Sequence, residues 1–424
     1  MKDQIGNASM NNHHISILNK IWLIIFFVLL FISGYPSANA NLEIFTEDSN
    51  GNITTLTSPP DESPVLSSIP VLFVHGHLRN FQETWLEPVN GFTSFGAALT
   101  ANSHLGIKPY FINFQDNNRS IVEDAVEIGQ AVEIILGRHN TNYDPDNPDS
   151  ITRKIVIIAH SKGTISTRLY LKTLYPLKGE FFPDVLGGSA ILPDRNANFR
   201  PVSEFIAISP PNHGLKQLVT SSSPLSVKQL NNGYDIFCQP LNDYAATDFI
   251  AELNGHPIRD THVSANLTKQ NYPNEAPGSR SIEQPSDSGI LYVTFYSEQN
   301  RDLVGGDTPS VVNYPLLSNC PNTEGRKLAR NLADNTENFP IKAESIPIGT
   351  YIPGSNEILV HRNTVHACEV IYRSLYTATH HRPPSAIHDG ICTSESSIPE
   401  IPGSYPFWHG IFTDWWNWFR LNLF

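Results

Sequence analysis

The sequence has few charged residues, and the positive ones are in the minority. Of its 424 residues, 28 are Lys or Arg and 41 are Asp or Glu, so the formal net charge is −13. No stretch gathers Lys and Arg into a patch with interleaved aromatic residues. Because binding to the phosphates of a nucleic acid requires such a cluster, the composition argues against a nucleic-acid partner.

Cysteine is scarce as well, and the absence of any Cys-x-x-Cys pair argues against a zinc site. The four cysteines are Cys238, Cys320, Cys368 and Cys392. In an exported chain an even number of cysteines predicts disulfide bonds. We favour the pairs Cys238–Cys320 and Cys368–Cys392 because this scheme closes the shortest loops, and four buried free thiols remain the alternative.

The apolar run near the N-terminus is too short to span a bilayer, which takes about 20 residues. Lys20 precedes the run, which extends over residues 21–33, and Ala38-Asn39-Ala40 follows it. A positive residue, a short apolar run and a small-x-small site are typical of a secretory signal peptide. We therefore predict cleavage after Ala40 and export to the periplasm or the medium, with an uncleaved membrane anchor as the alternative.

Apolar runs typical of buried strands alternate with helical patterns along the middle of the chain. Strands are expected at residues 42–45, 52–57, 69–77, 110–114, 154–160, 204–209, 289–297 and 357–360, and helices at residues 120–136 and 164–175. This alternation predicts an α/β fold with a mostly parallel, doubly wound sheet, right-handed crossovers and helices on both faces. For the first helix, Ser120 is expected to be the N-cap and Glu123 to complete a capping box.

Two polar stretches interrupt the alternation, and no internal repeat is present. Residues 214–288 and 308–352 are rich in Ser, Asn and Pro, which favours insertions on the sheet over separate domains. The first insertion is placed where a lid or cap could cover a site. We expect one domain over residues 41–378 and a C-terminal extension over residues 379–424.

The stretch Ile155 to Gly163, IVIIAHSKG, carries the strongest chemical signal. A buried strand ends there at a serine, Ser161, and a helical pattern follows at once. Ligands of an open parallel sheet bind beyond the carboxyl ends of its strands. A sharp strand-to-helix turn needs small residues two positions before and after the serine, and Ala159 and Gly163 meet that need. The pattern predicts that Ser161 is a nucleophile.

A serine nucleophile acting on a carbonyl also needs donors for the oxyanion that develops. In this architecture one donor is the backbone N–H after the nucleophile, which belongs to Lys162. Gly76 permits a turn after an earlier strand that aims the N–H of His77 as the second donor. We expect the imidazole of His75 to bond the loop backbone, and the charged side chain of Lys162 to lie at the mouth of the site.

A base and an acid should follow the last two strands of the alternation. Asp302 comes five residues after the strand that ends at Ser297, and Asp307 is its rival. His361 directly follows the strand at 357–360, whereas His366 comes five residues later, near the start of a helix. We predict that His361 is the base and that Asp302 orients its imidazole.

Together these segments resemble the α/β-hydrolase fold and, within it, the secreted bacterial lipases and esterases. Several of those lipases carry Ala-His-Ser-x-Gly at the nucleophile, as residues 159–163 do here. The resemblance covers about residues 68–378, in the order PVLFVHGH, AHSKGTISTRLYL, ISPPNHG, DFIAELN and the Asp302 and His361 segments. It implies a triad of Ser161, His361 and Asp302. Lys162 departs from the Met or Gln common in those lipases.

The predicted function is therefore that of an exported serine hydrolase that cleaves carboxylic ester or lipid substrates through an acyl-enzyme, without a metal or organic cofactor. An amidase, a thioesterase, a polyester depolymerase or an inactive binding protein of the same fold are the alternatives. Residues 405–424 hold four of the six tryptophans and form an amphipathic pattern. This aromatic tail is expected either to contact a membrane interface or to pack on the domain.

Overall fold

In a computed structural model of the chain, eight strands among the described residues form a single sheet in the order β2-β1-β4-β3-β5-β6-β7-β8. β1 pairs antiparallel with β2 and β4, and all the strands from β4 to β8 along the sheet run parallel. The strands are β1 (Glu43–Glu47), β2 (Ile53–Thr55), β3 (Ile69–Val74), β4 (Ile107–Asn113), β5 (Ile155–His160), β6 (Val202–Ile208), β7 (Leu291–Ser297) and β8 (Thr336–Ile341).

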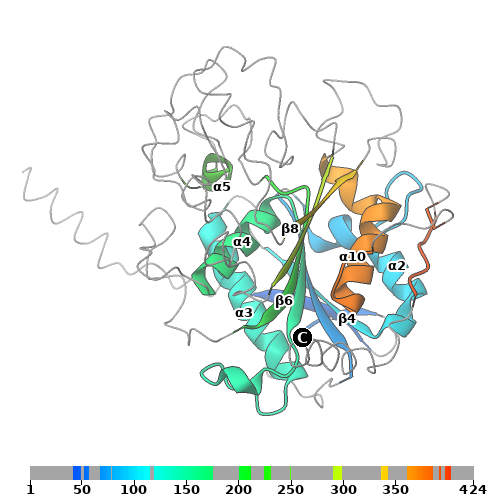
Figure 1. The fold of residues 1–424 in the computed structure, drawn as a ribbon. Helices are drawn as coiled ribbons and strands as arrows, with labels where there is room; N and C mark the ends of the chain where they lie inside the picture. Colours follow the sequence, from blue (N-terminus) through cyan, green and yellow to red (C-terminus); the bar gives the residue numbers. More distant parts are fainter. Residues whose placement is uncertain are drawn as a thin grey trace, which may run out of the picture. The chain divides into compact units, whose positions relative to one another are not determined.

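Helices cover both faces of this sheet. Figure 1 shows α3 and α4 against one face and α2 and α10 against the other. The helices are α2 (Phe95–Ala101), α3 (Ile121–His139), α4 (Lys162–Leu174), α5 (Leu225–Gln229) and α10 (Cys368–His380), with shorter turns η1 (Gln82–Leu86), η2 (Ser103–Leu105), η3 (Pro148–Ser150) and η9 (Thr364–His366). The predicted α/β class, with a mostly parallel, doubly wound sheet and helices on both faces, is confirmed.

The structure describes part of the chain. The described residues are 42–48, 52–56, 67–77, 79–114, 119–174, 200–211, 224–230, 249, 290–297, 336–341, 361–384, 391–392 and 397–402. Contacts divide the chain into residues 1–42 and residues 43–424, and the sheet belongs to the second unit. The predicted signal peptide, the predicted strand at 357–360 and the aromatic tail all lie outside the described residues. Within them, no helix is both long and apolar enough to cross a membrane.

Burial on both faces explains why the central strands β3 and β5 are almost entirely apolar. All six residues of β5 are buried, as are the last five of β3. On α3 the apolar residues that recur every three to four positions are buried, and the predicted capping box is present: the Ser120 side chain accepts from Val122 N–H, and Glu123 accepts from Ser120 N–H. The central strands and the start of α3 could therefore be predicted from local sequence patterns.

β8 lies inside residues 308–352, which the sequence pattern assigned to an insertion. It pairs in parallel with β7 at the end of the described sheet. Phe339 stacks on Phe295, with ring centroids 5.6 Å apart, and Ile341 is fully buried. A strand at a sheet edge needs few apolar residues and tolerates proline, and TENFPI therefore lacks the apolar run by which the other strands were recognised.

The first predicted insertion, residues 214–288, contains α5, which is attached to the start of α3. The side-chain oxygen of Gln229 accepts a hydrogen bond from Ile121 N–H at 2.8 Å, and its amide nitrogen donates to Ser120 Oγ at 3.0 Å. Part of the insertion therefore satisfies a backbone donor that the helix itself leaves free. Most of the rest of this insertion lies outside the described residues, so its predicted role as a lid or cap stays a prediction.

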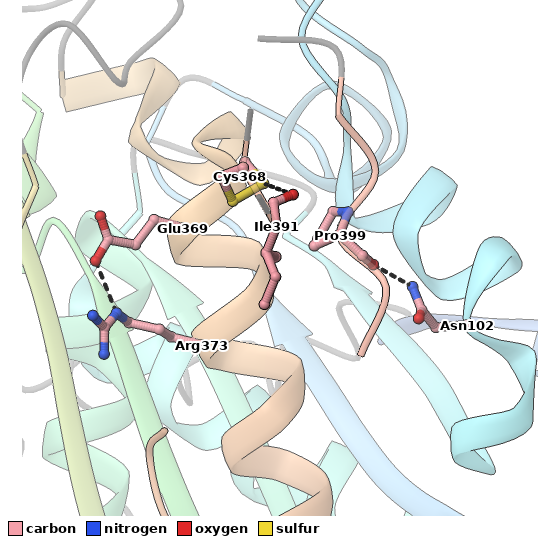
Figure 2. The surroundings of a disulfide bond; sticks show 7 residues. Asn102, Cys368, Glu369, Arg373, Ile391 and Pro399 are labelled. Carbon is pink, nitrogen blue, oxygen red and sulfur yellow. Dashed lines mark hydrogen bonds and ion pairs between the residues drawn. A yellow bond between two sulfur atoms is a disulfide. The ribbon is translucent and has the colours of Figure 1, made fainter. Parts of the chain in front are cut away.

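A disulfide and a short segment after it join α10 to α2. Cys368 and Cys392 are bonded, with Cα atoms 5.7 Å apart, so this predicted pair is confirmed. Cys238 and Cys320 lie outside the described residues. Figure 2 shows the disulfide beside the segment 397–402, which we call the C-terminal strap. Asn102 donates to Pro399 O at 2.9 Å and accepts from Ile401 N–H at 2.8 Å. Ile401 is fully buried in the core.

Candidate active site

Ser161 occupies a sharp turn between β5 and α4. Its φ angle is +52°, a left-handed conformation that is uncommon for a residue other than glycine and that stores strain. Its N–H donates to Ile208 O at 3.1 Å, and its carbonyl accepts from Thr164 N–H at 2.9 Å. Hydrogen bonds to β6 and to the first turn of α4 thus hold the strained residue in place.

Two glycines let the neighbouring strand ends approach this turn. A Cβ atom added at Gly163 would lie 2.5 Å from His75 O and 3.0 Å from Val74 O. A Cβ atom added at Gly76 would lie 2.7 Å from the Cβ of Ser161. The distances of 2.5 Å and 2.7 Å are shorter than real Cβ atoms show, so the small residue predicted at position 163 is required by the backbone at the end of β3.

His361 is the base candidate that the structure brings to the serine. Its Nε2 lies 2.7 Å from Ser161 Oγ, within hydrogen-bond distance, and the imidazole is buried. The residue stands at the start of a short helical stretch, residues 361–363, that leads into η9. Nucleophile and base therefore meet although 200 residues separate them in sequence. The acid candidates Asp302 and Asp307 lie outside the described residues.

His160, which directly precedes the nucleophile, holds the backbone of the base. Its Nε2–H donates to the carbonyl oxygen of His361 at 3.0 Å, and the two rings lie 5.3 Å apart. Burial, together with the nearby His361, holds the pKa of His160 well below its usual value. A neutral ring with its proton on Nε2 matches this hydrogen bond. His160 was not among the predicted site residues, because nothing in the local pattern indicates its partner.

The rival base, His366, faces a different partner. Its Nδ1 lies 3.2 Å from the carbonyl oxygen of Thr93, and the side chain is fully buried. Burial, with a smaller effect of the Arg79 charge, lowers the pKa of His366 to about 4. Because His366 is buried, neutral and bonded to a loop carbonyl, we assign it a structural role rather than that of the base.

The two predicted oxyanion donors stand on segments that touch one another. His77 is in the turn after β3, and Lys162 is the first residue of α4. Gly76 and Gly163, each adjacent to one of them, make the close backbone contacts described above. The main-chain N–H groups of His77 and Lys162 thus belong to the turn after β3 and to the start of α4, two segments that pack closely beside Ser161.

His75 bonds the loop backbone, as predicted. Its Nε2 accepts from Phe114 N–H at 3.0 Å, and its Nδ1–H donates to Gly76 O at 2.8 Å. Burial, aided by the charges of Lys162 and Arg119, lowers the pKa of His75 to about 4. The ring therefore stays neutral at pH 7, which lets one nitrogen accept while the other donates.

The prediction for the side chain of Lys162 is wrong. It is fully buried rather than at the mouth of the site, and its Nζ lies 2.9 Å from Oδ2 of Asp124 on α3. The physical reason is that Asp124 offers a buried carboxylate on the helix that packs against α4. Local sequence gave no signal for this pair, because its members belong to different helices.

Among the described residues, no group of three or more His, Cys, Asp or Glu side chains is arranged to hold a metal ion. The described arrangement brings several reactive groups together. It offers a serine hydroxyl, an imidazole that can accept the hydroxyl proton, and backbone donors at the same sheet edge.

Comparisons with known proteins give solved structures alone, since no protein-family model and no curated protein sequence matches the chain. Aspergillus fumigatus lipase B is 14% identical, with 77% of this chain and 56% of the lipase covered and a TM-score of 0.41. Bacillus licheniformis lipase BlEst2 in its mature form is 16% identical, with 51% of this chain and 68% of that one covered and a TM-score of 0.27. Est1E of Butyrivibrio proteoclasticus is 11% identical, with 75% and 94% covered and a TM-score of 0.29. The chain spans little more than half of the length of the Aspergillus lipase.

Proposed function

We propose that the protein is a serine hydrolase that cleaves carboxylic ester bonds, as lipases and esterases do. The observation that carries the proposal is the 2.7 Å hydrogen bond between His361 Nε2 and Ser161 Oγ, at a serine held in a left-handed turn. A serine hydroxyl is a weak nucleophile until an adjacent base takes its proton. The Nε2 atom of His361 is positioned to accept that proton.

The proposed reaction has two halves. His361 accepts the Ser161 proton as Oγ attacks the ester carbonyl, and the N–H groups of His77 and Lys162 donate to the oxyanion. The imidazolium then gives its proton to the leaving alcohol, and an acyl-enzyme forms. In the second half His361 activates a water molecule that attacks the acyl-enzyme, and the acid product leaves with Ser161 restored.

We assign the orienting carboxylate to Asp302. The assignment is supported by chain order, because Asp302 comes shortly after β7 and before His361. Its role would be to hold the imidazole in the tautomer whose Nε2 faces Ser161. Asp302→Asn should then lower kcat far more than Asp307→Asn, and equal effects of the two variants would leave the assignment without support.

We also propose that the chain is exported, with residues 1–40 removed. The short apolar run before Ala40 supports this, and the Cys368–Cys392 disulfide fits an oxidising compartment. N-terminal sequencing of the protein recovered from the periplasm or the medium should begin at Asn41. A protein that stays in the membrane with its original N-terminus would contradict export with cleavage.

The test of the activity is a panel of p-nitrophenyl esters of increasing acyl length, together with matched thioesters and anilides. Wild type should turn over the esters, and Ser161→Ala should lose about 10⁴-fold or more in kcat. Ser209→Ala is the matched control. It removes a hydroxyl from a buried serine with a φ of +49° at the end of neighbouring β6. A wild type that neither hydrolyses any substrate nor reacts with a fluorophosphonate probe would refute the proposal.

A further inference from the structure

Four charged side chains form a group between α3 and α4, and one of them belongs to the residue that follows Ser161. We call Arg119, Asp124, Glu127 and Lys162 the Asp124 cluster. Asp124 accepts from Arg119 Nε at 2.9 Å through Oδ1 and from Lys162 Nζ at 2.9 Å through Oδ2. Arg119 also pairs with Glu127. Two positive and two negative charges are thus enclosed between the N-terminal halves of α3 and α4.

The cluster is nearly free of solvent. The side chains of Asp124 and Lys162 are 0% exposed, and that of Arg119 is 10% exposed. Burial alone would lower the pKa of Arg119, but the hydrogen bond to Glu127 and the charges of Asp124 and Glu127 raise it above its usual value. Burying such pairs costs desolvation energy that apolar side chains of similar size avoid. Stability alone therefore gives no reason for a charged residue at position 162.

The position of Lys162 supplies another reason. Its backbone N–H is the proposed oxyanion donor, and its side chain leaves the same Cα towards Asp124. Ser166, one turn further along α4, donates to Asp124 Oδ2 at 3.1 Å and to Lys162 O at 3.3 Å. The first turn of α4 is consequently tied to α3 at two points, which restricts rotation of the peptide that carries the Lys162 N–H.

The same cluster reaches the segment of the second donor through Phe114. Lys162 Nζ and Arg119 Cζ lie 5.8 Å and 5.3 Å from the centroid of the Phe114 ring, close enough for cation–π attraction. Phe114 N–H donates to His75, and His75 donates to Gly76 O. A continuous set of contacts therefore runs from Asp124 to the residue that precedes His77.

We propose that the side chains of Lys162 and Asp124 are positioning residues that hold the two backbone donors, at His77 and Lys162, in register for the oxyanion. This inference rests on the proposed esterase function and names two side chains that take no part in the reaction itself. It predicts that breaking the ion pair weakens binding of the transition state while leaving binding of the substrate unchanged.

Lys162→Met is the principal variant, because it keeps the backbone N–H and the length of the side chain. Removing one oxyanion donor costs about 10²–10³-fold in kcat, so a donor that is present but loosened should cost about 10- to 100-fold. KM should stay within about twofold of wild type. The affinity for an alkyl boronic acid, whose tetrahedral adduct mimics the oxyanion, should fall in parallel with kcat.

The double variant Lys162→Met/Asp124→Asn separates positioning from stability. It restores the charge balance of the cluster, so we expect its melting temperature to exceed that of Lys162→Met, while kcat stays low because the tether is still absent. Ile135→Ala is the matched control. It truncates a fully buried side chain on α3 outside the cluster, and it should lower stability without lowering kcat.

The outcomes are distinct. An unchanged kcat in Lys162→Met, a loss confined to KM, or an equal loss of kcat in Ile135→Ala would overturn the inference while leaving the esterase function intact. Recovery of kcat together with stability in the double variant would also overturn it. An inactive wild type that the fluorophosphonate probe does not label would refute the proposed function, and the inference with it.

Discussion

At the residue scale, the turn at Ser161 depends on the absence of a side chain at the neighbouring Gly163. Gly163 has no Cβ, and one placed there would lie 2.5 Å from the backbone oxygen of His75. Backbone cannot move aside as the end of a flexible side chain can. The approach of β3 to the start of α4 therefore requires glycine at this position, and the distance between the two oxyanion donors depends on that approach.

Gly163→Ala should accordingly be destabilising. We expect a loss of about 2–4 kcal/mol in the free energy of unfolding, from overpacking against rigid backbone, together with a lower kcat. Gly137→Ala is the control, because a Cβ on that residue of α3 meets only Tyr143 at 3.7 Å. It should stabilise by about 0.5–1 kcal/mol. Urea unfolding of both variants measures the contrast, and similar effects would contradict the role given to Gly163.

His160 permits a second test at this scale, because it donates to His361 O. His160→Leu leaves that buried carbonyl without its donor, which costs about 1–3 kcal/mol, and should lower kcat about tenfold by loosening the base. His160→Gln retains an N–H near the same place and should recover most of the loss. Equal kcat values in the two variants would show that the hydrogen bond does not position His361.

At the element scale, α10 ends in contact with the sheet. His381, in a left-handed conformation just after the helix, pairs with the buried Glu204 of β6. Its hydrogen bond to Glu204 raises the pKa of His381 above 6.5, although burial opposes the rise. Lys154 lies close enough to Glu204 to interact with it, and His380 interacts with both His381 and Arg382. The end of α10 is thus held by an interaction that is strongest when the imidazole is protonated.

This pair should make stability depend on pH. A raised folded pKa means that the contribution is fully present below the unfolded pKa, about 6.5, and is lost as the pH rises through the higher folded value. The difference in unfolding free energy between wild type and His381→Gln should therefore be largest near pH 5.5 and shrink towards pH 8.5. Because the imidazole is 65% exposed, solvent screening keeps the difference small. A difference that grows with pH would contradict the assignment.

The elements predicted from sequence were those whose patterns are local. β5 is apolar from Ile155 to Ala159 because both of its faces are covered, and the Ser120–Glu123 capping box lies within four residues. β8 was missed because an edge strand carries few apolar residues. The buried ion pair of the Lys162 side chain was missed because its partner, Asp124, comes 38 residues earlier and lies on another helix. What could not be predicted depends on contacts between elements, which no single stretch of sequence encodes.

At the scale of the whole molecule, the C-terminal strap (residues 397–402) comes just before the aromatic tail (residues 405–424) in the sequence. The hydrogen bond that Asn102 donates to Pro399 O and the one that it accepts from Ile401 N–H hold the strap against η2 and the end of α2. A chain ending at Gly403 therefore keeps the strap and loses only the tail. The effect of that truncation reports on the tail without disturbing the core at Ile401.

We expect the truncated chain to keep the melting temperature of the wild type and its kcat on soluble esters, while losing binding to liposomes. Co-sedimentation with phosphatidylcholine vesicles measures that binding, and Trp-rich amphipathic segments of this kind bind at the interface of a bilayer. Aggregation of the truncated chain would show instead that the tail covers the domain. Unchanged vesicle binding would assign lipid contact to another surface.

The bond between Asn102 and Ile401 joins residues 299 positions apart. A growing polypeptide on the ribosome has the asparagine long before it has its partner, so this part of the core stays open through most of synthesis. Contacts of such long range also slow folding once the chain is complete. A chain that cannot complete its core early remains unfolded for longer, and that delay would serve the export that we propose, because a chain threaded through a membrane channel must still be unfolded.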